Sequence, residues 1–207
     1  MGSLMYALMD THPNITFATN TVAQFIDNPA WIYWEAVRQI FRYLKGTKDL
    51  ALVYVSEKMN LIGFVDADGA VFVVDGGAVS WSSKKQELVI LSTTEAEYMA
   101  TTHVAKEAMW LHSLITKIFA PLDIKLTTST TLHGDNQSAI ALAHGGSYHA
   151  CTKNIDICYH FICYTIEAGL IKLIYCPTGK QTADTLTKAL PSMKAKHFAN
   201  SMGLRAV

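Results

Sequence analysis

Hydrophobic residues recur at helical spacing early in the chain. The pattern predicts a helix over Trp31–Lys45, and Gly46 provides a stop. Pro13 and Pro29 precede it, so we expect short helices and loops before this helix. The side of the helix expected to be buried comprises Trp34, Val37, Ile40, Phe41 and Leu44.

The period of the hydrophobic pattern changes after Leu50, where short apolar runs alternate with turn residues. Asp68-Gly69 favours a tight hairpin, and Gly76-Gly77 favours a second turn. Runs joined by tight turns lie side by side, so we expect an antiparallel meander. The strands are expected at 50–55, 61–65, 70–74 and 78–82.

A long helix is predicted over Thr94–Ile118, ending before Pro121. Its buried stripe is expected to comprise Ala96, Met99, Ala100, Val104, Trp110, Leu111, Leu114 and Ile118. The succession of strands and helices indicates an α/β fold with a sheet of mixed direction and helices on its faces. The remaining elements are expected as strands at 130–133 and 170–175 and helices at 136–143, 159–168, 183–190 and 193–202.

Composition narrows the classes of function. Half of the 207 residues are hydrophobic and 16% are charged, so the chain can bury a core. Lys plus Arg equals Asp plus Glu at 17 each, which argues against nucleic-acid binding by bulk positive charge but not against an acidic metal site. No apolar run approaches the roughly 18 residues of a membrane span. The four cysteines form no CxxC pair, so we expect a reduced, intracellular protein without a zinc site.

Four carboxylates occupy predicted strand ends or helix starts: Asp66, Glu97, Asp135 and Asp184. Each also has a purely structural explanation. Asp66 could be exposed beside the turn, Glu97 could pair with Thr94 in a capping box, Asp135 could cap a helix, and Asp184 suits a first helical turn. Gathered at one sheet edge, however, the four would repel one another unless a cation intervened. Mg²⁺ prefers such oxygen ligands.

Several segments resemble the ribonuclease H end of copia-type LTR retrotransposon polyproteins. They include LSTTEAEYMA at 91–100, GDNQSAIAL at 134–142 and TADTLTK at 182–188, with further likeness over 34–47 and 78–86. The likeness covers nearly the whole chain. It implies that residues 1–55 are the segment that connects the polymerase to ribonuclease H, and that residues 56–207 form the ribonuclease H domain.

The resemblance implies a ribonuclease H-like fold with a mixed five-stranded sheet and helices on both faces, preceded by a small connection segment of helices and a strand. It implies cleavage of the RNA strand of RNA/DNA hybrids with two Mg²⁺ ions, for which Mn²⁺ can substitute. Asp66 would bridge both ions, Asp184 would help to hold the ion that activates water, and Glu97 and Asp135 would hold the other. The implied partners are the hybrid and the polymerase domain of the same polyprotein. No membrane association is implied, and the expected location is the cytoplasm (in a virus-like particle) or the nucleus.

Candidate contacts to nucleic acid are Lys84, Lys85, Gln86 and Asn136, although a salt-bridged surface explains the first three equally well. Trp81 is expected in the core rather than as a base-stacking platform. The loop 176–181 lacks the histidine that many ribonucleases H carry before the last aspartate. We therefore expect no catalytic histidine, His149 and His160 included.

The chain departs from the family pattern at two places. The basic, serine-rich loop that usually follows Asp68 is missing, which alters one side of the substrate groove. Cys151, Cys158 and Cys163 stand where arginine is common, so phosphate contacts would be weaker. An alternative function is therefore a decayed or repurposed module that binds nucleic acid or a protein partner without cleavage.

Overall fold

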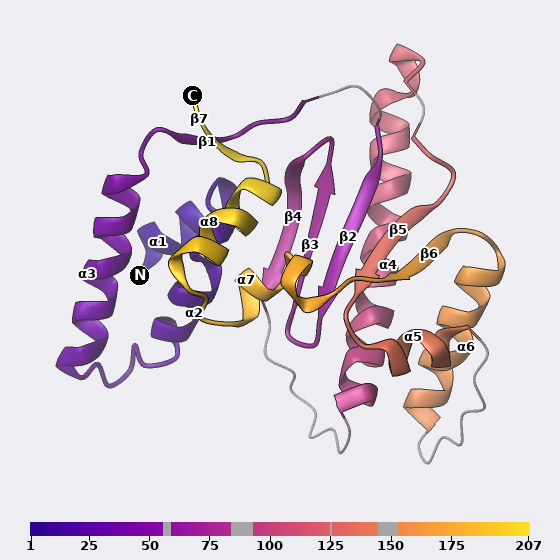
Figure 1. Ribbon diagram of the computed structural model, residues 1–207, viewed down its shortest axis with the longest axis horizontal. Coiled ribbons are helices and arrows are strands. Elements are labelled where there is room, and N and C mark those ends of the chain that lie inside the picture. Colours follow the sequence, from indigo (N-terminus) through magenta and orange to yellow (C-terminus); the bar gives the residue numbers. More distant parts are fainter. Residues whose placement is uncertain (56–58, 84–92, 125, 145–152) are drawn as a thin grey trace.

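The computed structural model describes residues 1–55, 59–83, 93–124, 126–144 and 153–207, and it is built around one mixed sheet (Figure 1). The strand order is β4-β3-β2-β5-β6. β2, β3 and β4 form an antiparallel meander, whereas β5 and β6 run parallel to β2. This confirms the predicted mixed five-stranded sheet. The strands are β2 (Leu61–Asp66), β3 (Gly69–Val74), β4 (Gly77–Ser83), β5 (Thr130–Gly134) and β6 (Ile171–Tyr175).

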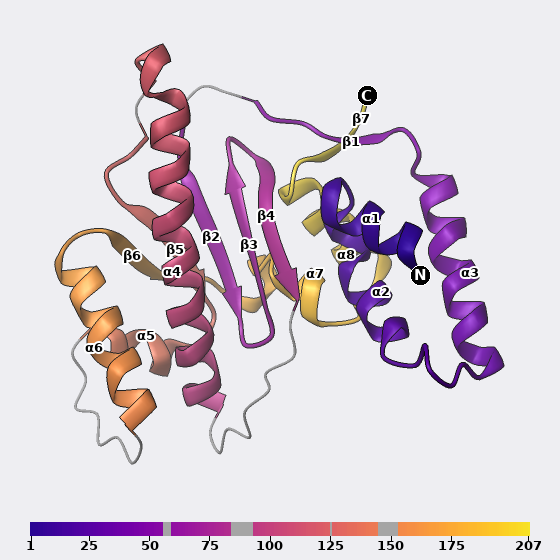
Figure 2. The ribbon, with the colours of Figure 1, turned by 180° about the vertical axis from the view of Figure 1, so that it is seen from behind.

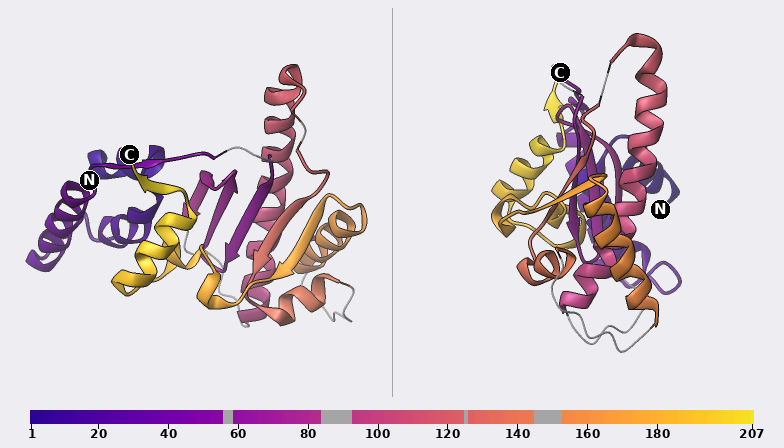
Figure 3. Two further views of the ribbon diagram at one scale, coloured as in Figure 1. Left: turned by 45° about the horizontal axis from the view of Figure 1, so that its top comes forward. Right: turned by 90° about the vertical axis from the view of Figure 1, so that its right-hand side faces the viewer.

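Helices cover both faces of this sheet, as predicted. On one face lie α4 (Thr93–Phe119) and α6 (Lys153–Glu167), and on the other lie α7 (Asp184–Thr187) and α8 (Ser192–Ser201) (Figures 2 and 3). The alternation along β3 explains the two layers. Phe72 faces the larger core with α4, α6 and the short helix α5 (Gln137–Ala143), while Val71 and Val73 join Leu186 and Met202 in a second core.

The first 55 residues form a small helical layer beside the sheet. It contains α1 (Gly2–Asp10), α2 (Thr16–Ala23) and α3 (Trp31–Gly46), and its own core consists of Leu4, Leu8, Ile15 and Ile40. The Trp81 indole N–H donates to the Leu8 carbonyl at 2.7 Å, and Asn20 Nδ2 donates to the Ser83 carbonyl at 3.1 Å. Both bonds join this layer to β4, the edge strand of the sheet.

A separate two-stranded sheet pairs β1 (Leu50–Leu52) antiparallel with β7 (Leu204–Ala206). The prediction for 50–55 was therefore wrong in length and in partner, because β1 pairs with the end of the chain and not with the meander. β7 itself was not predicted. Among the residues that the structure describes, no helix is long and apolar enough to cross a membrane.

The helical period placed α3 and α4 correctly, but part of each predicted buried stripe was wrong. Trp34 and Phe41 are 54% and 48% exposed on α3, where Ile40 is the buried residue. On α4, Trp110, Leu114 and Ile118 are exposed. The small residues Ala105 and Ala108 face the sheet instead and let the helix approach closely, together with Tyr98, Val104, Leu111 and Ile115.

Candidate metal centre at the ends of the central strands

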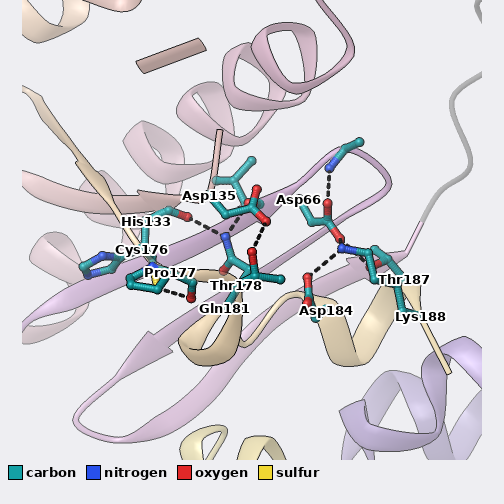
Figure 4. Close-up of polar contacts among 12 residues, drawn as sticks. Asp66, His133, Asp135, Cys176, Pro177, Thr178, Gln181, Asp184, Thr187 and Lys188 are labelled. Carbon is teal, nitrogen blue, oxygen red and sulfur yellow. Dashed lines mark hydrogen bonds and ion pairs between the residues drawn. The ribbon is translucent and has the colours of Figure 1, made fainter. Parts of the chain in front are cut away.

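Three of the four predicted carboxylates meet at the carboxyl ends of two neighbouring parallel strands. Val65 on β2 is level with Gly134 on β5, so Asp66 and Asp135 follow at the same height. Glu97 reaches them from the first turns of α4. Carboxylate oxygens of Asp66, Glu97 and Asp135 all lie within 4.8 Å of one another. We call these three residues the carboxylate trio. Figure 4 shows Asp66 and Asp135 at the two strand ends.

The structural explanation for Asp135 as a helix cap is wrong. Asn136 is the N-cap of α5, and its side-chain oxygen accepts the Ala139 N–H at 3.0 Å. The Asp135 carboxylate instead accepts a hydrogen bond from the Thr178 hydroxyl at 3.2 Å. Asp135 is therefore directed into the trio, while the proposed nucleic-acid contact of Asn136 stays a prediction.

The pKa values of Glu97 and Asp66 shift in opposite directions. The pKa of Glu97 is raised to about 8, first by burial and then by the negative charges of Asp66 and Asp135. Burial also acts on Asp66, which is 5% exposed. Its pKa is nevertheless lowered, because hydrogen bonds from Thr187, Lys188 and the Ala67 N–H outweigh the desolvation. Oxygen ligands that repel one another in this way fit a hard divalent cation such as Mg²⁺.

The fourth predicted carboxylate, Asp184, joins the site through a lysine. Lys188 Nζ lies 2.9 Å from Asp184 Oδ1 and 3.1 Å from Asp66 Oδ2 (Figure 4). Burial raises the pKa of Asp184 even though Lys188 opposes the shift. The pKa of Lys188 is itself raised, because its contacts with the two aspartates outweigh its own desolvation. Sequence reasoning missed Lys188, although its position four residues after Asp184 was a usable signal.

Gln181 links the two strands that present Asp66 and Asp135, and sequence reasoning missed it as well. Its side chain is fully buried, and Nε2 donates to the carbonyls of Val65 at 2.8 Å and His133 at 3.3 Å. Val65 directly precedes Asp66, and His133 lies two residues before Asp135. One amide group thus joins the ends of the two strands that present the aspartates (Figure 4).

The shortened hairpin after Asp66 closes as a two-residue turn. Asp66 pairs with Gly69, which leaves Ala67 and Asp68 as the turn. A Cβ on Gly69 would lie 2.7 Å from Thr187 Cγ2 and 3.1 Å from the Ser82 carbonyl oxygen. Glycine at this position therefore allows α7 to approach β3 closely enough for Thr187 to reach Asp66.

Of the other candidate residues, some lie outside the described part of the chain and some pack in or beside the cores. Lys84, Lys85, Gln86, His149 and Cys151 lie outside the described residues. Cys158 packs partly buried against the larger core, and Cys163 Sγ donates to the Ala143 carbonyl at 3.6 Å. Trp81 packs against the second core, which confirms its predicted structural role. Among the described residues, the group that can hold a metal ion consists of Asp66, Glu97 and Asp135.

The strand order and the parallel pair β2–β5 agree with the ribonuclease H-like fold that the motifs implied. The chain is 38% identical over 218 aligned residues to a retrovirus-related Pol polyprotein from transposon TNT 1-94 of Nicotiana tabacum. It is 34% identical over 220 aligned residues to that from transposon RE1 of Arabidopsis thaliana. Over its full length the chain is homologous to retrovirus-related Pol polyproteins of plant transposons, in agreement with the resemblance of its motifs.

These alignments cover the whole chain but only 16% and 15% of the two relatives. No protein-family model matches the chain. Among solved structures, it is similar to the N-terminal RNase H domain of rv2228c from Mycobacterium tuberculosis, studied as a fusion with maltose-binding protein. That likeness has a TM-score of 0.44 at 15% identity and covers 70% of this chain and 99% of the other.

Proposed function

We propose that the chain hydrolyses the RNA strand of RNA/DNA hybrids as the ribonuclease H part of a retrotransposon polyprotein. The observation that carries this proposal is the carboxylate trio, whose oxygens lie within 4.8 Å of one another at the ends of β2 and β5. The family relationship supports the same activity. On this proposal, residues 1–55 are the connection to the polymerase region and residues 56–207 the nuclease domain.

Asp66, Glu97 and Asp135 would hold one divalent cation, and Asp66 with Asp184 would hold a second. Bound Mg²⁺ would supply electrostatic stabilisation of phosphodiester hydrolysis and a more acidic water. Asp66 is already oriented as an anion, because Ala67 N–H donates to Oδ1 at 2.8 Å while Thr187 and Lys188 contact Oδ2. Glu97, with its pKa of about 8, would release a proton when a cation binds.

The same proposal covers how the RNA/DNA hybrid would be recognised. The chain has a formal net charge of zero, so bulk positive charge does not hold the hybrid. We propose that individual phosphate contacts position the hybrid and that the 2′-hydroxyls mark the RNA strand. The polymerase region of the polyprotein would supply part of the affinity for the hybrid, because a neutral surface gains little from counterion release.

The test uses the purified chain and an RNA/DNA hybrid labelled on the RNA strand, in Mg²⁺, in Mn²⁺ and in chelator. We expect metal-dependent cutting that Asp135→Asn abolishes without unfolding the protein. Asp123→Asn is the matched control, because it makes the same chemical change at an exposed position outside the trio. The control should cut like the parent chain.

A folded chain that binds the hybrid in chelator but cuts with neither metal would contradict the proposal. It would favour the alternative of a decayed or repurposed binding module. The two-residue turn of Ala67 and Asp68 would then be the first feature to lengthen, since it stands where the family has a longer loop.

A further inference from the structure

Lys188 holds a fixed place between two of the predicted metal ligands. Its ammonium contacts Asp184 Oδ1 at 2.9 Å and Asp66 Oδ2 at 3.1 Å. The two aspartate side chains are each 6% exposed, whereas the lysine side chain is 48% exposed. A positive charge on a partly solvated stem thus reaches a pair of buried carboxylates (Figure 4).

Contacts of the two preceding residues, Leu186 and Thr187, position the backbone that carries this lysine. Leu186 of α7 is buried in the second core, and Thr187 donates to Asp66 at 2.5 Å. The close approach at Gly69 seats α7 against β3. Lys188 follows α7 directly and is four residues after Asp184, a spacing that places both side chains on one side of a helical turn.

The two sides of Asp66 therefore differ in charge. Towards Asp184 stands the Lys188 ammonium, within 3.1 Å of both carboxylates. Towards Glu97 and Asp135 stand two further carboxyl groups, each of which can offer an oxygen ligand to a cation. A divalent cation gains most on the second side, because on the first it would meet a positive charge already in contact with its ligands.

We propose that Lys188 acts as a tethered cation that fills the Asp66–Asp184 side of the site. The trio then binds the first divalent ion, and a second ion binds only by displacing the Lys188 ammonium. This inference rests on the proposed function, in which the carboxylates hold divalent cations. Displacement is feasible because the half-exposed stem of Lys188 can turn its ammonium towards water.

The test measures Mn²⁺ binding to the full chain without nucleic acid, by calorimetry and by the electron paramagnetic resonance of free Mn²⁺. The parent chain should bind one Mn²⁺ well and a second weakly. Lys188→Met keeps the apolar stem and removes the charge, so its second ion should bind about tenfold or more tightly. Lys188→Gln is a second neutral variant, and Lys188→Arg should resemble the parent chain.

Lys194→Met is the matched control, because it removes an exposed lysine on α8 and should leave both affinities unchanged. Thermal unfolding of every variant confirms that the folded protein is compared. Equal affinity for the second ion in the parent chain, Lys188→Met and Lys188→Gln would overturn the role of Lys188 while leaving the trio as a metal site. Absence of Mn²⁺ binding in all folded variants would overturn the metal centre of the proposed function, and this inference with it.

Discussion

Thr187 donates its hydroxyl hydrogen to Asp66 Oδ2 at 2.5 Å, although the two residues are 121 positions apart. The bond connects the helix that begins with the last predicted ligand, Asp184, to the strand that carries the first. It also favours the charged form of Asp66, whose pKa is lowered despite burial. The shape of the acidic site therefore depends on where α7 sits against the sheet.

Replacing Thr187 with valine should lower stability and weaken metal binding. Thr187→Val keeps the branched shape but removes the donor to a buried carboxylate, which should cost about 2 kcal/mol of unfolding free energy. Urea unfolding and Mn²⁺ titration measure the two effects. Thr187→Ser, which keeps the hydroxyl, should stay closer to the parent chain. Equal losses in both variants would show that packing, and not the hydrogen bond, matters at this position.

Gly69→Ala should destabilise the protein through α7. The added methyl group would meet Thr187 Cγ2 at 2.7 Å and the Ser82 carbonyl at 3.1 Å, and overpacking of this kind costs about 1–3 kcal/mol. In a Thr187→Ser background the Cγ2 contact is gone, so the cost of Gly69→Ala should be smaller. A double-mutant cycle from urea unfolding measures the coupling between the two positions, and simple additivity would contradict this account.

The stability of the protein in chelator should depend on pH through Glu97. Its pKa is raised from 4.5 to about 8, first by burial and then by the charges of Asp66 and Asp135. The folded state thus binds the Glu97 proton more tightly than the unfolded chain does. The stability gained from this proton is fully present below the unfolded pKa and is lost as pH rises through the folded pKa.

Urea unfolding across this range, compared with Glu97→Gln, isolates the contribution of Glu97. The variant should lack the fall in stability between pH 4.5 and about 8. Added Mg²⁺ should flatten the same fall in the parent chain, because a cation favours the charged carboxylate. Parallel pH curves for the parent chain and the variant would contradict the assignment to Glu97.

Gln181→Met should separate the ends of the two central strands. Methionine has a similar length but no donor for the carbonyls of Val65 and His133. Leaving buried carbonyls without a partner costs about 1–3 kcal/mol each. We also expect weaker Mn²⁺ binding, because Asp66 and Asp135 follow these strand ends. Gln181→Asn, with its shorter side chain, should be intermediate; a Gln181→Met chain with parent stability would refute the role.

The strands of the main sheet and most of the helices were predictable, because local period and turn residues determine them. The sequence patterns also pointed to Asp66, Glu97 and Asp135, which the structure brings together. Helix phase was harder to predict. Trp110 and Ile118 fit the helical stripe by hydrophobicity, yet both are exposed. The side of α4 that packs against the sheet carries the small residues Ala105 and Ala108. Steric fit between two surfaces leaves little trace in the pattern of one helix.

The supporting residues of the site could not be predicted for a different reason. Gln181 contacts Val65 across 116 residues of sequence, and Lys188 contacts Asp66 across a comparable span. The contacts with Val65 and Asp66 depend on which segments the fold brings together; only the spacing of Lys188 from Asp184 gave a local signal. Asn136 shows the converse. It caps α5 through a local bond to Ala139, which a capping preference could have assigned in place of Asp135.

The pairing of β1 with β7 sets an order of events during synthesis. Leu50–Leu52 emerges from the ribosome long before its partner, Leu204–Ala206, exists. The Val53 N–H can likewise donate to the Gly203 carbonyl only after Gly203 has been synthesised. The helical layer of the first 55 residues can collapse on its own core, but its link to the end of the chain closes only when translation of this region is complete. A nascent chain whose β7 has not yet left the ribosome therefore holds the helical layer without this link.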